Sequence, residues 1–207
     1  MSLSAETTQI TFRISPFSFF QTNTHGAEKL FSTAFAMLGN VKGNILDLYC
    51  GTGSIGLSLL KMSNGSFEKE QKEQAELPSL IGIEIVEDAI IDARMNAKLN
   101  GLEKQSFFVA SPAEKALEKY PELAEKIKNL SVVIVDPPRD GLHKNVVEWI
   151  ASLKEKQPFK LLYISCNPIT MARDVELFLE KGFVLKEVQP VDMFPQTHHI
   201  ESIGILY

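Results

Sequence analysis

A cysteine at the end of a predicted strand is the first candidate for chemistry in this sequence. Cys166 ends the apolar run that begins at Leu161, and Pro168 prevents the strand from continuing. Open α/β sheets bind ligands at the carboxyl ends of their strands, so Cys166 is predicted to be a nucleophile. The alternative is that Cys166 packs as a small hydrophobic side chain, as free cysteines usually do.

A glycine-rich turn follows the predicted strand at 45–49. Gly51 and Gly53 allow the backbone to turn tightly and approach a ligand, and the helix that follows offers unpaired N–H groups. The next strand ends in Glu84, whose carboxylate can bind both hydroxyls of a ribose. The spacing between Gly51 and Glu84 is longer than in dinucleotide-binding folds, but the polar segment 63–79 accounts for the excess. Dinucleotide binding therefore remains the competing interpretation.

A second carboxylate follows the apolar run 132–135. Asp136 precedes Pro137 and Pro138, which stiffen the backbone and remove two N–H donors. A rigid floor that carries a carboxylate suits a flat ring held at a fixed distance from a donor group. A hydride-transfer site has no evident need for it, so the pattern favours a methyl donor, S-adenosylmethionine, over a dinucleotide.

Composition limits the class of protein. The 207 residues are 44% hydrophobic and 23% charged, which suits one large globular domain or one domain with an appendage. With Cys50 and Cys166 as the only cysteines, a disulfide framework is implausible and zinc or iron–sulfur sites lack ligands, so no metal is expected. No stretch has the length of a membrane span and no signal pattern is present, so we expect an intracellular, cytoplasmic protein without membrane contact. The net charge of −5 argues against strong nucleic-acid binding without a local basic patch or a further domain.

The elements that must position these residues follow an α/β pattern. Short apolar runs alternate with longer helical patterns after Gly43, which predicts a parallel sheet covered by helices. Strands are predicted at 45–49, 80–84, 106–110, 131–136, 160–165, 183–191 and 200–207. Helices are predicted at Thr24–Leu38, Gly53–Met62, Glu87–Asn100, Pro112–Lys128, Lys144–Lys154 and Thr170–Lys181. We expect residues 1–40 to be an N-terminal segment and helix that pack on a domain spanning 41–207, with 63–79 as a surface insertion.

Six motifs, in this order, resemble those of the RNA uracil-5-methyltransferases that use S-adenosylmethionine. They are Ser15-Pro-Phe-Ser-Phe-Phe-Gln-Thr-Asn23, Asp47-Leu-Tyr-Cys-Gly-Thr-Gly53, Gly82-Ile-Glu84, Asp136-Pro-Pro-Arg-Asp-Gly141, Ser165-Cys-Asn-Pro168 and Asp192-Met-Phe-Pro-Gln-Thr-His-His-Ile-Glu201. The resemblance covers nearly the whole chain, from Phe12 to Tyr207. It implies a class I, Rossmann-like methyltransferase fold with a mixed seven-stranded sheet and helices on both faces.

The resemblance also implies residue roles. The cofactor-contacting positions would be Gln21, Tyr49, Gly51, Gly53, Ser54, Glu84, Ser111 and Asp136. Glu84 would bind the ribose of S-adenosylmethionine. Ser54 stands where the family often has asparagine, and Ser111 matches its family position only loosely. Cys50 is expected to pack beneath the cofactor loop.

Uracil chemistry explains why a cysteine and a base are both needed. Carbon 5 of uracil is a poor nucleophile, but a thiolate added at carbon 6 turns the ring into an enolate whose carbon 5 is nucleophilic. Cys166 is the candidate for that attack. A general base must then remove the proton from carbon 5, and the resemblance assigns this role to Glu201, with His198 and His199 as rivals.

The implied substrate is a uridine in RNA, unstacked so that the ring can be reached, with transfer RNA favoured over ribosomal RNA. Phe17, Phe19, Phe20 and Phe194 are candidates for stacking on it. Arg139 and Arg173 are candidates for contact with phosphate or base, with a solvated salt bridge as the alternative. Family members commonly carry a further N-terminal RNA-binding domain, so we expect this chain to be a catalytic fragment.

Two other functions are weighed against this one. A non-catalytic, methyltransferase-like RNA-binding module would not need Cys166 and Glu201. A methyltransferase acting on another target would leave Cys166 without a role.

Overall fold

A seven-stranded sheet with the strand order β5-β4-β3-β6-β7-β9-β8 lies at the centre of the protein. The structure is a computed structural model that describes residues 2–3, 8–15, 21–69 and 77–207. The strands of the sheet are β3 Asn44–Leu48, β4 Leu80–Glu84, β5 Ser106–Ala110, β6 Leu130–Val135, β7 Lys160–Ser165, β8 Leu185–Val191 and β9 Glu201–Leu206. Two short strands near the N-terminus, β1 Ser2–Leu3 and β2 Thr8–Gln9, pair with each other.

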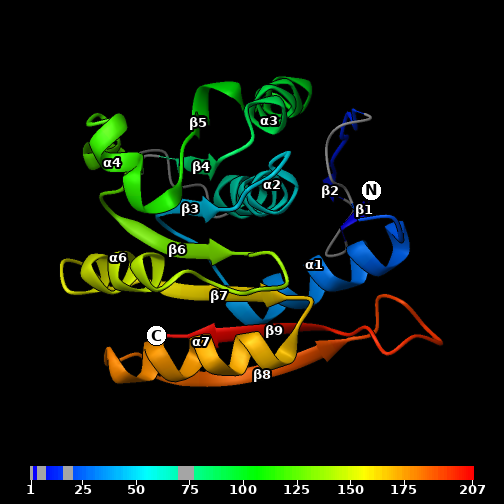
Figure 1. The fold of residues 1–207 in the computed structure, drawn as a ribbon. Coiled ribbons are helices and arrows are strands. Elements are labelled where there is room, and N and C mark those ends of the chain that lie inside the picture. Colours follow the sequence, from blue (N-terminus) through cyan, green and yellow to red (C-terminus); the bar gives the residue numbers. More distant parts are fainter. Residues whose placement is uncertain (1, 4–7, 16–20, 70–76) are drawn as a thin grey trace.

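The sheet is mixed, as predicted. The strands β5, β4, β3, β6 and β7 pair in parallel, whereas β9 runs antiparallel to both β7 and β8. The helices are α1 Thr24–Leu38, α2 Ser54–Lys69, α3 Glu87–Leu99, α4 Ala116–Lys119, α5 Leu123–Lys126, α6 Lys144–Lys154 and α7 Pro168–Glu180. Figure 1 shows the strands stacked in this order with helices packed around them.

The two faces of the sheet belong to different hydrophobic clusters. In β6, Val132 and Ile134 pack with α1, α2 and α3, whereas Val133 and Val135 pack with the helices from α4 to α7. Successive strand residues point to opposite faces, so a strand buried on both sides is apolar throughout. Helices on both faces therefore cover the sheet, as the predicted Rossmann-like architecture requires.

Two predicted helices differ from those observed. The helix predicted at Pro112–Lys128 is broken into a 3-10 turn, α4 and α5. Tyr120 adopts φ −131° and ψ 79°, and it precedes Pro121, whose ring disfavours the helical conformation of the residue before it. The helix predicted to end at Met62 instead continues as α2 to Lys69, so the first part of the predicted insertion is helical.

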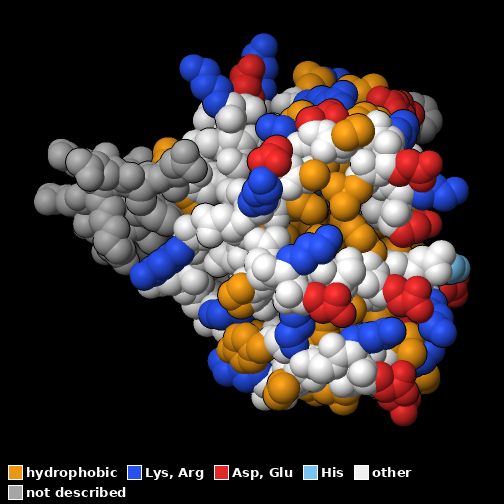
Figure 2. Space-filling view, turned by 90° about the vertical axis from the view of Figure 1, so that its left-hand side faces the viewer, with side chains coloured by type: hydrophobic (Ala, Val, Ile, Leu, Met, Phe, Trp, Pro, Cys, Tyr) orange, Lys and Arg blue, Asp and Glu red, His pale blue; other side chains and the backbone are white. Residues whose placement is uncertain are grey.

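The face at the amino-terminal ends of the parallel strands is shown in Figure 2. Lysine and arginine side chains are interspersed there with acidic side chains around hydrophobic patches. The described part of this face therefore presents no uniformly positive surface. Nor does any helix in the described ranges combine the length and apolar character that crossing a bilayer requires.

Close packing at Gly82 in β4 generates a stability prediction. A Cβ atom at Gly82 would collide with the ring of Phe108 and lie 2.9 Å from Sγ of Cys50. We expect Gly82→Ala to lower the free energy of unfolding by about 1–3 kcal/mol because the buried ring must shift. Gly65→Ala in α2, where a Cβ meets nothing within 4 Å, should instead raise it by up to about 1 kcal/mol. Urea denaturation measures both, and equal stability of the two variants would contradict this packing.

Candidate active site at the carboxyl edge of the sheet

The predicted catalytic pair lies at one edge of the sheet. Cys166 follows β7, and Glu201 is the first residue of β9. Because β9 is antiparallel to β7, its start lies at the carboxyl end of β7, and the register pairs Ser165 with Ser202. This register brings Cys166 and Glu201 together, 35 positions apart in sequence.

Burial and charge shape the chemistry of this pair. Cys166 is partly exposed, whereas Glu201 is only 4% exposed. Burial raises the pKa of Glu201, and Arg139 opposes the shift. Burial and the charges of Glu201 and Asp136 raise the pKa of the Cys166 thiol, which Arg139 again opposes. A raised pKa makes Glu201 a stronger base, and it gives a smaller but more nucleophilic thiolate population at Cys166.

The turn that carries Cys166 is held by local hydrogen bonds. The Asn167 side chain accepts from the backbone N–H of Ile169 at 3.1 Å and so caps α7, with Pro168 at its first position. The hydroxyl of Ser165 accepts from the Asn167 N–H at 3.1 Å and donates to the Asn167 carbonyl at 3.0 Å. The thiol is therefore presented from a fixed strand-to-helix turn.

Asp136 directly follows β6 and interacts electrostatically with both members of the predicted catalytic pair. Burial and the charge of Glu201 raise its pKa to about 7. Asp136 consequently holds a proton over part of the neutral pH range, unlike an ordinary aspartate.

The glycine turn and the carboxylate of Glu84 form one unit. Gly51 and Gly53 have φ angles of 52° and 78°, in the left-handed region that glycine adopts without strain. The N–H of Gly51 donates to Glu84 Oε2 at 3.2 Å, and the N–H groups of Ile85 and Val86 donate to Oε1 at 2.7 and 3.0 Å. Both oxygens of Glu84 are thus fixed at the strand tip, with lone pairs left to accept from ligand hydroxyls.

Other predicted pocket residues lie around this unit. Tyr49 is half-buried with a φ of 62°, and burial raises its pKa to about 12. Ser54 is the first residue of α2. Ser111 follows β5, but its side chain is buried and its hydroxyl donates to the Pro112 carbonyl at 3.0 Å. Ser111 is therefore better placed to support the turn than to contact a ligand through its hydroxyl.

Asp47 was not among the predicted site residues. It lies in β3 and is 1% exposed. Its Oδ2 accepts from the N–H of Gly56 at 3.0 Å, and its Oδ1 has no hydrogen-bond partner among the residues that the structure describes. Burial raises its pKa well above the usual range, and the charges of Asp136 and Glu84 add to the shift. An acidic residue within the apolar run from Ile45 to Leu48 was the sequence signal that could have revealed it.

The N-terminal segment reaches this edge from two sides. The Asn96 side chain in α3 accepts from the Arg13 N–H at 2.7 Å and donates to the carbonyl of Thr52, in the glycine turn, at 3.1 Å. Asn23 caps α1 and donates to the carbonyl of Met193 at 2.8 Å. The partly exposed Gln21 therefore lies two residues from a direct contact with the 192–199 segment.

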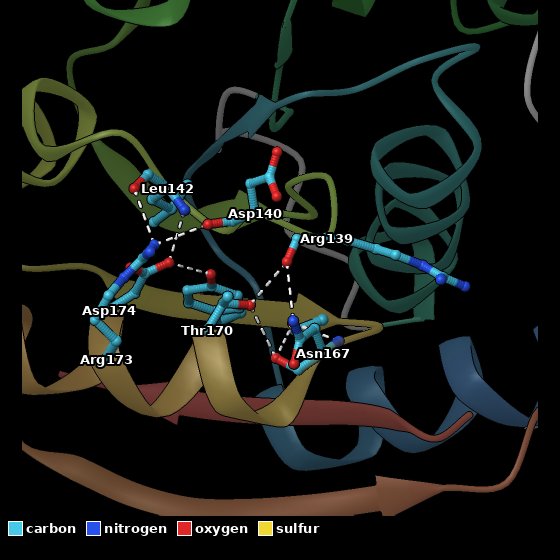
Figure 3. A network of polar contacts seen from close by, with 9 residues as sticks. Arg139, Asp140, Leu142, Asn167, Thr170, Arg173 and Asp174 are labelled. Atoms are coloured by element: carbon cyan, nitrogen blue, oxygen red, sulfur yellow. Dashed lines mark hydrogen bonds and ion pairs between the residues drawn. The ribbon is translucent and has the colours of Figure 1, made fainter. Parts of the chain in front are cut away.

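The candidates for stacking on the base and for contact with phosphate differ in where they lie. The predicted stacking residues Phe17, Phe19 and Phe20 lie outside the described residues, and Phe194 is partly buried against the hydrophobic core. Arg173 forms an ion pair with Asp174 at 2.6 Å, the structural alternative to a substrate contact. Figure 3 shows the exposed Arg139 side chain extending away from this network.

His198 and His199 lie next to each other in the segment before β9. The rings of His198 and His199 lie 4.1 Å apart, and desolvation, His198 and Arg139 lower the pKa of His199. No group of three or more histidine, cysteine or acidic side chains within the described ranges could hold a metal ion.

Cys50 is 6% exposed, and burial raises its pKa well above the ordinary value, as expected for a packing role.

These residues fit a cofactor that carries ribose hydroxyls and a positive charge. Glu84 presents a fixed carboxylate, and Asp47 has a buried oxygen that no described residue hydrogen-bonds. A Cβ built at Gly51 would meet no described residue within 4 Å, so this part of the turn leaves room for a ligand among the described residues. S-adenosylmethionine has both of the required features.

Comparison with known proteins decides the family. The model of the tRNA (uracil-5-)-methyltransferase family matches residues 1–207. The chain belongs to this family. An uncharacterized RNA methyltransferase of Caldanaerobacter subterraneus subsp. tengcongensis is 41% identical over 196 residues, which cover 94% of this chain and 38% of that protein. The chain thus spans less than half the length of that relative.

Solved structures confirm the class I methyltransferase fold. The precorrin-6y C5,15-methyltransferase of Geobacter metallireducens superposes with a TM-score of 0.65 at 11% identity, covering 95% of this chain and 93% of that one. TrmK of M. capricolum, in complex with S-adenosylhomocysteine, superposes with a TM-score of 0.57 at 13% identity and covers 86% and 66%. At these identities the likeness concerns the fold.

The raised pKa of Asp136 predicts how stability depends on pH. Its pKa in the folded state is about 7 against 3.8 for a free side chain, so ionisation between about pH 4 and pH 7 destabilises the folded state. Asn has no charge to desolvate. We therefore expect the stability of Asp136→Asn relative to the unmodified protein to increase as pH rises through this window. Urea denaturation without cofactor at pH 5 and pH 8 measures the change, with the exposed Asp140→Asn as control; a pH-independent difference would contradict the assignment.

Proposed function

We propose that this chain is the catalytic part of a longer enzyme that transfers a methyl group from S-adenosylmethionine to carbon 5 of a uridine in RNA. The observation that carries the proposal is the β7–β9 register, which brings the partly exposed Cys166 thiol beside the buried carboxylate of Glu201. A nucleophile and a base at one ligand-binding edge are what methylation at carbon 5 of uracil needs. Membership of the tRNA (uracil-5-)-methyltransferase family favours transfer RNA over ribosomal RNA as the substrate.

In the proposed mechanism, the thiolate of Cys166 attacks carbon 6 of the uracil ring. The electron pair of the C5=C6 double bond then forms an enolate over carbon 5 and the carbonyl oxygen at carbon 4. Carbon 5 of the enolate would take the electrophilic methyl group that S-adenosylmethionine supplies when bound, with cleavage of the methyl–sulfonium bond and departure of S-adenosylhomocysteine. Glu201 then takes the proton from carbon 5, and the carbon–sulfur bond breaks to release the Cys166 thiolate and the 5-methyluridine product. Burial of Glu201 supports this step because its raised pKa favours acceptance of a proton.

Asp136 and the two prolines after it form the floor of the proposed site. Because its pKa is about 7, protonated Asp136 can donate a hydrogen bond to a uracil oxygen on which enolate charge develops. The proposed cofactor pocket comprises Gln21, Tyr49, Gly51, Gly53, Ser54, Glu84 and Asp136, with Ser111 supporting the turn beside it. We add the buried Asp47 to this proposed pocket. Glu84 is proposed to bind the ribose hydroxyls.

The covalent step is tested with RNA that contains 5-fluorouridine. A base cannot remove fluorine from carbon 5 as it removes a proton. The Cys166 adduct should therefore accumulate in the presence of S-adenosylmethionine and be visible by mass spectrometry. Cys166→Ala should abolish the adduct, whereas Cys50→Ala, the matched control, should retain it. An adduct that persists in Cys166→Ala would contradict the mechanism.

The base is tested with Glu201→Gln and ordinary uridine RNA. Glutamine cannot accept the proton, so the methylated adduct should form but release product about 100-fold or more slowly, as expected for loss of a general base. Single-turnover kinetics with trapping of the covalent species measures the release. Release at the unmodified rate would move the base role to His198, His199 or water.

A further inference from the structure

A buried carboxylate that takes no part in the proposed chemistry lies behind the site. Asp174 in α7 is fully buried. Its Oδ2 accepts from the backbone N–H of Leu142 at 2.6 Å and from the hydroxyl of Tyr163 at 2.7 Å. Its Oδ1 accepts from Nε and Nη2 of Arg173 at 2.9 and 2.6 Å. Four donors thus satisfy a charge that would be costly to bury alone.

These bonds join the segments that carry the proposed site. Leu142 ends the segment 136–142 after β6, which contains Asp136 and Arg139. Tyr163 lies in β7, three residues before Cys166, and Asp174 lies in the helix that begins after it. One carboxylate therefore ties the floor of the site to the strand and helix that present the thiol.

The backbone of the same segment is attached to α7 at further points (Figure 3). The carbonyl of Arg139 accepts from Nδ2 of Asn167 and from Oγ1 of Thr170, each at 3.1 Å. The carbonyl of Asp140 accepts from Nη2 of Arg173 at 2.9 Å. These contacts hold the backbone of Arg139 while leaving its guanidinium group exposed.

Gly141 shows how closely the segment is seated. Its φ is 78°, and a Cβ there would lie 2.5 Å from Oδ2 of Asp174 and 2.6 Å from Nη2 of Arg173. The backbone therefore rests directly on the ion pair. A carboxylate can accept from donors on both of its oxygens, whereas an asparagine presents one oxygen and an NH₂ group that repels donors.

We propose that Asp174 is a positioning residue that fixes the segment 136–142 against α7 and so sets the place of Arg139 and Asp136 relative to Cys166. The inference rests on the proposed function in taking Cys166 as the nucleophile. Among the described residues, the charged side chains that act on the thiol are those of Glu201, Asp136 and Arg139. Among them Arg139 favours the thiolate, and its effect depends on where the segment holds it.

A double-mutant cycle on the alkylation of Cys166 tests the role without RNA or cofactor. Arg139→Ala should slow alkylation by iodoacetamide at neutral pH by about threefold, because the thiolate loses a nearby positive charge. In an Asp174→Asn background the same substitution should have little effect, since Arg139 is no longer held in place. Glu176→Gln, an exposed site on the same helix with the same change of charge, should leave the threefold effect intact.

Equal effects of Arg139→Ala in the unmodified and folded Asp174→Asn proteins would overturn the proposal. If Asp174→Asn does not fold, Thr170→Val decides by the same measure, because it removes one of the two donors to the Arg139 carbonyl. In methylation assays, Asp174→Asn should lower kcat by about 10- to 100-fold, as expected for misplaced reacting groups, with KM for S-adenosylmethionine unchanged. If Asp174→Asn removes the effect of Arg139→Ala on alkylation but the unmodified protein does not methylate RNA, only the proposed function is contradicted.

Discussion

The antiparallel pairing of β9 with β7 is the interaction on which the candidate site depends. In a wholly parallel sheet, the start of the last strand would lie at the edge opposite Cys166. Reversal of β9 brings Glu201 to the carboxyl edge, where β4 ends in Glu84 and Asp136 follows β6. The reversed strand is secured by burial, because Ile203 and Ile205 pack into one hydrophobic cluster and Leu206 into the other.

Carboxylates dominate the electrostatics of this edge. Asp47, Asp136 and Glu201 all have raised pKa values, with burial as the largest cause. The repulsion between them costs stability in the free protein, and a ligand with a positive charge would relieve it. Proteins commonly carry such strain at functional sites, where binding offsets it. The edge is therefore suited to a cationic cofactor more than to the polyanionic backbone of RNA.

Polar side chains behind the candidate site fix the positions of the segments that form it. Asn96 links the N-terminal segment to the glycine turn, and Asn23 links it to the segment before β9. Asp174 joins the segment after β6 to α7. Because each of these side chains bonds to backbone groups of a distant segment, each fixes a chain path that strand pairing alone leaves open.

Local patterns in the sequence were enough to predict the seven strands of the central sheet in their order along the chain, the bounds of α1 and the position of Glu84 at the end of β4. They also determined the family, because the motifs are contiguous and keep their order. The helix predicted across Pro121 was wrong because the restriction that proline places on the residue before it outweighs the helical apolar spacing. Only the tertiary structure decided that Cys166 adjoins Glu201, that Asp47 and Asp136 have raised pKa values, and that Asp174 is the buried junction. These properties depend on long-range register and on burial, and the spacing of neighbouring residues determines neither.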